Sequence, residues 1–258
     1  MLNTIQKELK LAMSKMIEEV TYNGKTLVKL TTDNVAIVEA MIRNDSAYIH
    51  SSDVKALPIY NTKNEVKYGG SSAYWMTKLK DDLINNEDIK DLDREIIEGA
   101  VKAVDRENST HLNADKCGNK GGRIEIIDRI CKFSKAEFIQ CLKNPDYEDM
   151  KLVREIARIT SAEKRARINV SFASKFCHYA CFYIFENTEY QDNYSICDNI
   201  LKSVLPMYLE YFGIDEKFDL NEYKQYRTAV DMVRKASGIE ISRNGFDHLL
   251  WYYHKGRM

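Results

Sequence analysis

The chain has 258 residues, of which 44% are hydrophobic and 30% are charged, with 3 prolines and 11 glycines. This composition is typical of a folded, mainly helical protein and argues against a disordered one, while the length suits one large domain or two lobes. A net charge of −1 argues against a protein that coats nucleic acid indiscriminately, because such proteins are usually strongly basic.

The first residues predict a helix rather than a signal for export. Residues 2–20 alternate charged and apolar positions as an amphipathic helix does, without the apolar core of a signal peptide. No apolar run elsewhere approaches the roughly 20 residues that a membrane span needs. We therefore expect a cytoplasmic protein that makes no contact with a membrane.

The next segments predict a strand and several helices. Residues 25–30 have the short alternation of a strand or an extended arm. Helical spacing follows over 34–43, where Thr32 or Asp33 is expected to cap the helix, because a side-chain oxygen there can accept free amides of the first turn. Further helices are predicted over 71–85 and 92–107.

The polar, glycine-rich stretch 113–122 is the expected boundary between lobes. It separates an N-terminal, mostly helical lobe with a short extended segment, at 1–115, from a helical domain at 116–258. In that domain Pro145 suits the first turn of a helix over 146–158.

A turn at 160–161 then leads into a long helix that runs from about 162 to 185. Later helices are expected to end near Gly213 and Gly238, since glycine favours helix ends.

The six cysteines lack paired C-x-x-C spacing, so reduced thiols are expected. Cys177 and Cys181 lie four residues apart around His178, which leaves two interpretations: a metal-binding helix face or cysteines of the core. Because no second pair of ligands is evident, we favour the core and expect neither a metal nor another cofactor.

Two groups of basic residues are candidates for contact with a phosphate backbone. A charge cluster is usually a solvated surface, but the second group adjoins the helix discussed next. The residues assigned to DNA binding are Lys120, Arg123, Lys164, Arg165 and Arg167.

The predicted helix that ends near 185 carries an unusual lysine. Phe172 and Phe176 lie four residues apart and share a face. Lys175 lies on an otherwise apolar helix and must find a partner or a watery cavity, because an unpaired buried ammonium is costly. The alternative is that Lys175 reaches out to solvent and that Phe172 belongs to the core.

Two segments nearer the C-terminus add carboxylates. Asp198 stands where a loop gives way to an apolar helix, which is also the place of an ordinary capping residue. Asp247 precedes Trp251 by four residues, and the alternative for this pair is a helix cap and a core indole.

Together these segments resemble the helix-hairpin-helix DNA glycosylases, in particular the branch typified by the archaeal 8-oxoguanine glycosylase. That branch has a phenylalanine-alanine-x-lysine motif, then an apolar-x-aspartate segment, then aspartate-x-x-x-tryptophan. The matching residues here are Phe172 to Lys175, Ile196 to Asp198, and Asp247 to Trp251. The resemblance spans about 124–254 and implies a mainly α, glycosylase-like helical bundle, to which the N-terminal lobe is added.

The resemblance also implies roles for single residues. Phe172 and Trp251 would stack on the two faces of a flipped-out base, and Asp247 would bond to its edge. Asp198 would be the catalytic carboxylate. Lys175 would pair with a carboxylate of the pocket, either Asp247 or Asp198.

One departure from the family alters the expected chemistry. Ile168 stands where the family has its nucleophilic lysine, and an isoleucine forms no Schiff base with the sugar. The neighbouring Asn169 is assigned to substrate binding. The resemblance then implies a monomeric, monofunctional glycosylase that acts on double-stranded DNA with a modified base and leaves an abasic site. Some monofunctional bacterial relatives resemble antiviral defence enzymes that remove hypermodified cytosine from phage DNA.

Two other functions stay open. One is a helical protein that binds DNA or RNA without catalysis, in which Asp198 is merely a cap; the other is a helical scaffold or defence partner without nucleic acid. The enzyme would be favoured if its predicted pocket residues converge on one cavity, namely Phe172, Lys175, Asp198, Asp247 and Trp251. The excised base is left open, as is the role of Tyr74 and Trp75, which could complete the pocket.

Overall fold

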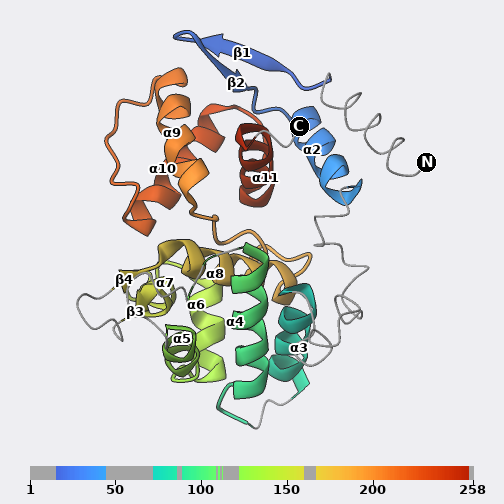
Figure 1. Cartoon of the computed structure of the whole chain (residues 1–258), viewed down its shortest axis with the longest axis vertical. Coiled ribbons are helices and arrows are strands. Elements are labelled where there is room, and N and C mark those ends of the chain that lie inside the picture. The colour runs from blue at the N-terminus through green and yellow to red at the C-terminus, as the bar shows by residue number, and fades with distance from the viewer. Residues whose placement is uncertain are drawn as a thin grey trace. The chain divides into compact units, whose positions relative to one another are not determined.

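The computed structural model describes residues 16–44, 72–85, 89–108, 110, 112, 122–159 and 167–255, which are mainly helical (Figure 1). The chain forms two compact units. The first unit combines Met1–Ile49 with Ser195–Met258, and the second is the continuous stretch His50–Tyr194. Among the described residues, no helix is long and apolar enough to cross a membrane.

The first unit contains one hairpin and four described helices. Its elements are β1 (Glu19–Tyr22), β2 (Lys25–Val28), α2 (Thr32–Asn44), α9 (Asn199–Tyr211), α10 (Tyr223–Ala236) and α11 (Arg243–His254). The strands pair antiparallel, with Glu19 opposite Val28. Asn23 and Gly24, both with positive φ, form the tight turn between them.

The structure confirms the predicted strand and corrects two details beside it. The predicted helix over 2–20 is wrong at its end, because Glu19 and Val20 lie in β1, where pairing with β2 outweighs the helical pattern; residues 1–15 lie outside the described part. The cap of α2 is Thr31 rather than Thr32 or Asp33, since the Thr31 hydroxyl accepts the Asn34 amide at 3.1 Å.

Helices α2 and α11 pack closely in this unit. Gly245 permits the contact, because a Cβ at this position would come within 3.0 Å of a Val35 methyl group. The Tyr208 hydroxyl of α9 donates to the Val28 carbonyl at 3.0 Å and so ties the hairpin to the helices. The first unit is therefore built from chain segments far apart in sequence.

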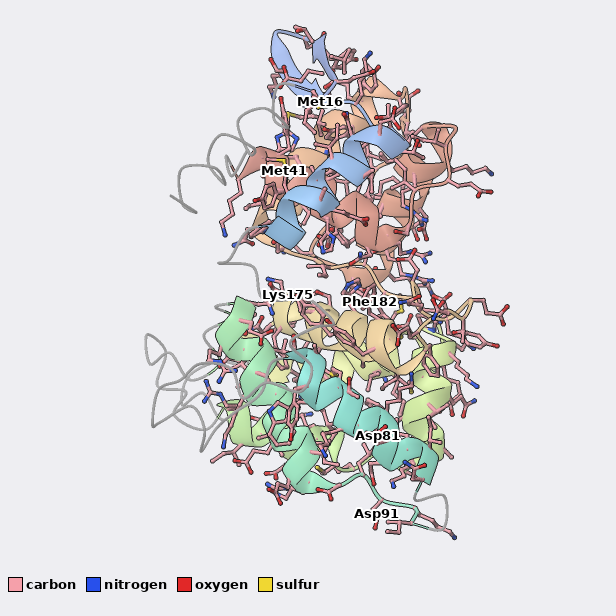
Figure 2. The ribbon with its side chains drawn as sticks, turned by 90° about the vertical axis from the view of Figure 1, so that its right-hand side faces the viewer. Met16, Met41, Asp81, Asp91, Lys175 and Phe182 are labelled. Carbon is pink, nitrogen blue, oxygen red and sulfur yellow. The ribbon has the colours of Figure 1, made fainter. Side chains whose placement is uncertain are left out.

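The described residues of the second unit are mainly helical and include one short pair of strands. Its elements are α3 (Ser72–Asn85), α4 (Arg94–Asn108), α5 (Gly122–Ile130), α6 (Lys135–Lys143), α7 (Lys151–Ala157), β3 (Arg158–Ile159), β4 (Arg167–Ile168) and α8 (Val170–Ile184). Helices α3, α4, α6 and α7 all pack on α8. Figure 2 labels Lys175 and Phe182 on this helix. Because most of its positions are apolar and buried, α8 forms the core of the unit.

The predicted lobe boundary at residues 115 and 116 lies inside this second unit. The reason is packing: α3 and α4, which precede the boundary, contact helices that follow it, α3 on α8 and α4 on both α5 and α8. Residues 113–121 themselves lie outside the described part.

Two predicted helices begin later than expected. Helix α7 starts at Lys151 rather than at 146, because Glu148, Asp149 and Met150 have φ values of 44°, 56° and 58°, which a right-handed helix cannot include. Helix α8 starts at Val170 rather than near 162, because Arg167 and Ile168 pair with β3 instead. The connection between α7 and α8 is thus an antiparallel hairpin, whose residues 160–166 lie outside the described part.

Candidate functional site

The residues predicted to form a pocket belong to both units. Asp198, Asp247 and Trp251 lie in the first unit, and Asn169, Phe172 and Lys175 lie in the second.

Asp198 is the N-cap of α9. Its Oδ1 accepts the Leu201 amide at 3.0 Å, and the residue is 7% exposed. This is the capping role that the sequence left open. A carboxylate has two acceptor oxygens and the cap occupies one of them, so capping does not use up the chemistry of the group.

Asp247 and Trp251 occupy the middle of α11. The cap of this helix is Ser242, whose hydroxyl accepts the Gly245 amide at 2.9 Å, so Asp247 is not a cap. Asp247 is buried, with 6% of its surface exposed. Trp251 is partly exposed, and Lys255 places its Nζ 4.2 Å from the centre of a Trp251 ring. The alternative was a core indole. Trp251 differs from it, because its indole is partly exposed and lies one helical turn after the buried carboxylate of Asp247.

The two carboxylates share a neighbour, Tyr226 of α10. Burial raises the pKa of the Tyr226 hydroxyl well above its usual range, and electrostatic interactions with Cys197, Asp247 and Asp198 raise it further. Both carboxylates therefore lie close enough to this fully buried tyrosine to affect its pKa, although they come from different elements of the first unit. The sequence did not single out this tyrosine.

In the second unit, Asn169 and Phe172 have structural contacts at the start of α8. Asn169 caps the helix by accepting the Phe172 amide at 3.0 Å, and its Nδ2 donates to the Thr110 carbonyl at 3.3 Å. The Phe172 side chain has no exposed surface, and its ring lies 6.0 Å from that of Phe176. This is the core position that the sequence offered as the alternative, so a base could reach Phe172 only if α8 or its neighbours moved.

Lys175 is 8% exposed on α8 (Figure 2). Within the described residues of the second unit, no carboxylate lies at ion-pair distance from it. Its pairing with Asp198 or Asp247 stays a prediction.

Of the residues assigned to DNA binding, Lys120, Lys164 and Arg165 lie outside the described part. Arg167 lies in β4, and its side chain is not described. The Arg123 guanidinium donates to the Asp105 carboxylate through Nε at 3.1 Å and Nη2 at 2.5 Å. Because Asp105 is 4% exposed, Arg123 neutralises a buried charge in this structure.

Trp75 has a packing role in the second unit. Its ring lies against Gly99 of α4 so closely that a Cβ on Gly99 would overlap the indole. Tyr74 meets the Trp75 ring edge to face, with centroids 5.2 Å apart. A role in a pocket is not needed to explain either aromatic residue.

The cysteines near α8 are part of the core. Burial raises the pKa of Cys141 to about 11 and that of Cys177 well above its usual range, so both thiols stay protonated. Cys181 Sγ lies 3.4 Å from the Leu142 carbonyl. Metal ligation needs the thiolate, which this environment opposes, and the described residues contain no cluster of three metal-ligating side chains.

The HI_0787_N family model, described as an N-terminal domain, matches residues 60–183. No curated protein and no solved structure matches the chain. The matched stretch begins and ends inside the second unit, so it includes Lys175 but not Asp198, Asp247 or Trp251.

Proposed function

We propose that the protein is a monofunctional DNA glycosylase, which flips a modified or damaged base out of double-stranded DNA and hydrolyses its N-glycosidic bond. The observation that most supports this function is the arrangement in the first unit. Two buried carboxylates, Asp198 and Asp247, both act electrostatically on the buried Tyr226 hydroxyl, and the partly exposed Trp251 follows Asp247 by one helical turn.

Asp198 is the proposed catalytic group. As the base leaves, positive charge develops on the sugar, and a fixed carboxylate stabilises that charge and orients the attacking water. The bond from the Leu201 amide holds one oxygen of Asp198 in place and leaves the other for this purpose. Ordered placement before the reaction is what makes such electrostatic stabilisation effective.

Base recognition is assigned to α11. The Trp251 indole offers a plane for stacking, which contributes about 1–3 kcal/mol per base. Lys255 covers one side of that plane, so a base would stack on the other side or displace the lysine. Asp247, one turn earlier, would accept hydrogen bonds from the edge of the base.

Hydrolysis rather than strand cleavage is proposed because of Ile168. Ile168 stands where the helix-hairpin-helix glycosylases that the chain resembles have their nucleophilic lysine. It is 72% exposed and has no group that could attack the sugar. The product would be an abasic site in an uncut strand. Removal of hypermodified cytosine from phage DNA, as a defence, is the variant of this function that the resemblance suggests.

A matched pair of variants tests the assignment. Asp198→Asn removes the charge but keeps the cap, because asparagine caps helices as well as aspartate does. We expect fold and DNA affinity to be kept and base release to fall on the order of a hundredfold or more. Asp215→Asn, an exposed aspartate of the same unit, is the control and should retain full activity.

The assay compares duplexes with oxidised bases, plain DNA, and phage DNA with glucosylated hydroxymethylcytosine, and counts alkali-labile sites. Borohydride should trap no covalent adduct with the enzyme. Base release by Asp198→Asn at the wild-type rate would remove Asp198 from the mechanism. DNA binding without release of any base would favour the non-catalytic alternative.

A further inference from the structure

The residues just before Asp198 form a connecting segment outside the helices and strands. The backbone of Ser195 and Ile196 therefore cannot use the hydrogen bonds of α9, and both residues are buried. Buried backbone groups need partners, since an unsatisfied one costs free energy. Their partners lie on α10.

Two tyrosine hydroxyls supply these bonds. The Tyr223 hydroxyl accepts the Ser195 amide at 3.1 Å and donates to the Ser195 carbonyl at 2.9 Å. The Tyr226 hydroxyl donates to the Ile196 carbonyl at 2.7 Å. Three hydrogen bonds from α10 thus hold the two residues that precede Cys197 and Asp198.

The tyrosines are themselves firmly placed. They are three residues apart in the first turn of α10, their rings stack at a centroid distance of 6.4 Å, and both side chains are buried. Glu222 caps this turn by accepting the Lys224 and Gln225 amides. Helix α10 packs on α9, the helix that Asp198 caps.

We infer that Tyr223 and Tyr226 are positioning residues for the Asp198 carboxylate, an inference that rests on the proposed function. Neither tyrosine touches the substrate in this role. They hold the connecting segment in place, so that the carboxylate is fixed both by the amide of its own helix and by α10. Because a shift of about 1 Å in a reacting group can cost about a hundredfold in rate, loss of these bonds should slow base release.

The test removes one hydroxyl at a time. Tyr226→Phe deletes the donor to Ile196 and keeps the ring. Tyr208→Phe is the matched control, because Tyr208 is a buried tyrosine of the same unit whose hydroxyl also donates to a backbone carbonyl, that of Val28. Tyr226→Phe loses the bond to Ile196, and Tyr208→Phe loses the bond to Val28 together with the contact to His254 Nε2, so a general loss of stability affects the control at least as much.

We expect single-turnover base release to slow about tenfold in Tyr226→Phe and about a hundredfold in Tyr223→Phe/Tyr226→Phe, with DNA affinity unchanged. Tyr208→Phe should release bases at the wild-type rate. Equal slowing in Tyr208→Phe and Tyr226→Phe would overturn the positioning role.

A second measurement does not depend on activity. The Leu201 amide is bonded to Asp198, so its hydrogen exchange reports whether the carboxylate is still in place. Exchange should accelerate in Tyr226→Phe and in the double variant but not in Tyr208→Phe. Unchanged protection in the double variant would overturn the inference. Faster exchange in a protein that releases no base at all would confirm the positioning and reject the proposed glycosylase.

Discussion

The two units hold their candidate site residues with different chemistry. In the first unit, the neutral hydroxyls of Tyr223 and Tyr226 bind the backbone ahead of Asp198. In the second unit, a buried carboxylate binds the chain ahead of the candidate residues. Asp105 accepts the Thr110 hydroxyl at 2.6 Å, the Leu112 amide at 3.1 Å and the Arg123 guanidinium.

The Asp105 network reaches the start of α8. Asp105 holds Thr110 through the Thr110 hydroxyl. The Thr110 carbonyl in turn accepts a hydrogen bond from Nδ2 of Asn169, which caps α8. A second buried ion pair, Lys135 with Asp82 at 2.9 Å, joins α6 to α3. Removing one partner from a buried charge pair is far more costly than losing one neutral hydrogen bond. Point substitutions at these contacts should therefore destabilise the second unit more than the first.

The largest effect is expected from Lys135→Met, which leaves the Asp82 carboxylate buried without its cation. Both side chains are at most 7% exposed, so the free energy of unfolding should fall by about 3–5 kcal/mol. Urea denaturation measures the change. The double variant Lys135→Met/Asp82→Leu should recover most of the loss, because an apolar pair removes both charges. Failure to recover would mean that the lysine stabilises the unit chiefly through its hydrogen bond to the Asp82 carbonyl, at 3.0 Å, rather than by neutralising the carboxylate.

An intermediate effect is expected from glycines at helix contacts. Gly99→Ala in the second unit places a Cβ inside the Trp75 ring position and should cost about 1–3 kcal/mol, since the rigid indole must move. Gly245→Ala in the first unit meets a Val35 methyl at 3.0 Å, where a small shift suffices. We expect its cost to be smaller than that of Gly99→Ala. A larger cost for Gly245→Ala in thermal unfolding would reverse this ranking.

The smallest effect at neutral pH is expected at His254 of the first unit. Burial lowers its pKa from 6.5 to about 4, and its Nε2 lies 3.2 Å from the Tyr208 hydroxyl. Because the unfolded chain binds a proton more readily between these values, the contribution to stability is complete above pH 6.5 and is lost as the pH falls to 4. His254→Gln keeps an N–H group but does not titrate. Its Tm should match the wild type at pH 7 and fall less between pH 6.5 and 4; parallel curves would contradict the assignment.

The amino-acid sequence determined much of the local structure. Helical spacing located α3 and α4 to within two residues, and the alternation over 25–30 located β2. Gly213 and Gly238, with φ of 66° and 72°, follow the ends of α9 and α10 as expected. These features depend on neighbours in the chain, namely apolar periodicity, capping groups and the freedom of glycine to adopt a left-handed conformation.

Tertiary structure decided what the local pattern left open. Pairing of β4 with β3 set the start of α8. Packing of α3 and α4 on later helices placed all of these helices in one unit, which includes the boundary predicted at 115 and 116. The part of Tyr226 in the candidate site depends on a hydrogen bond that spans 30 residues, from α10 to the Ile196 carbonyl ahead of Asp198. Tyrosine at an apolar helix position looks like any core residue in sequence. Its function depends on which buried carbonyl its hydroxyl reaches, and only the folded chain brings the two together.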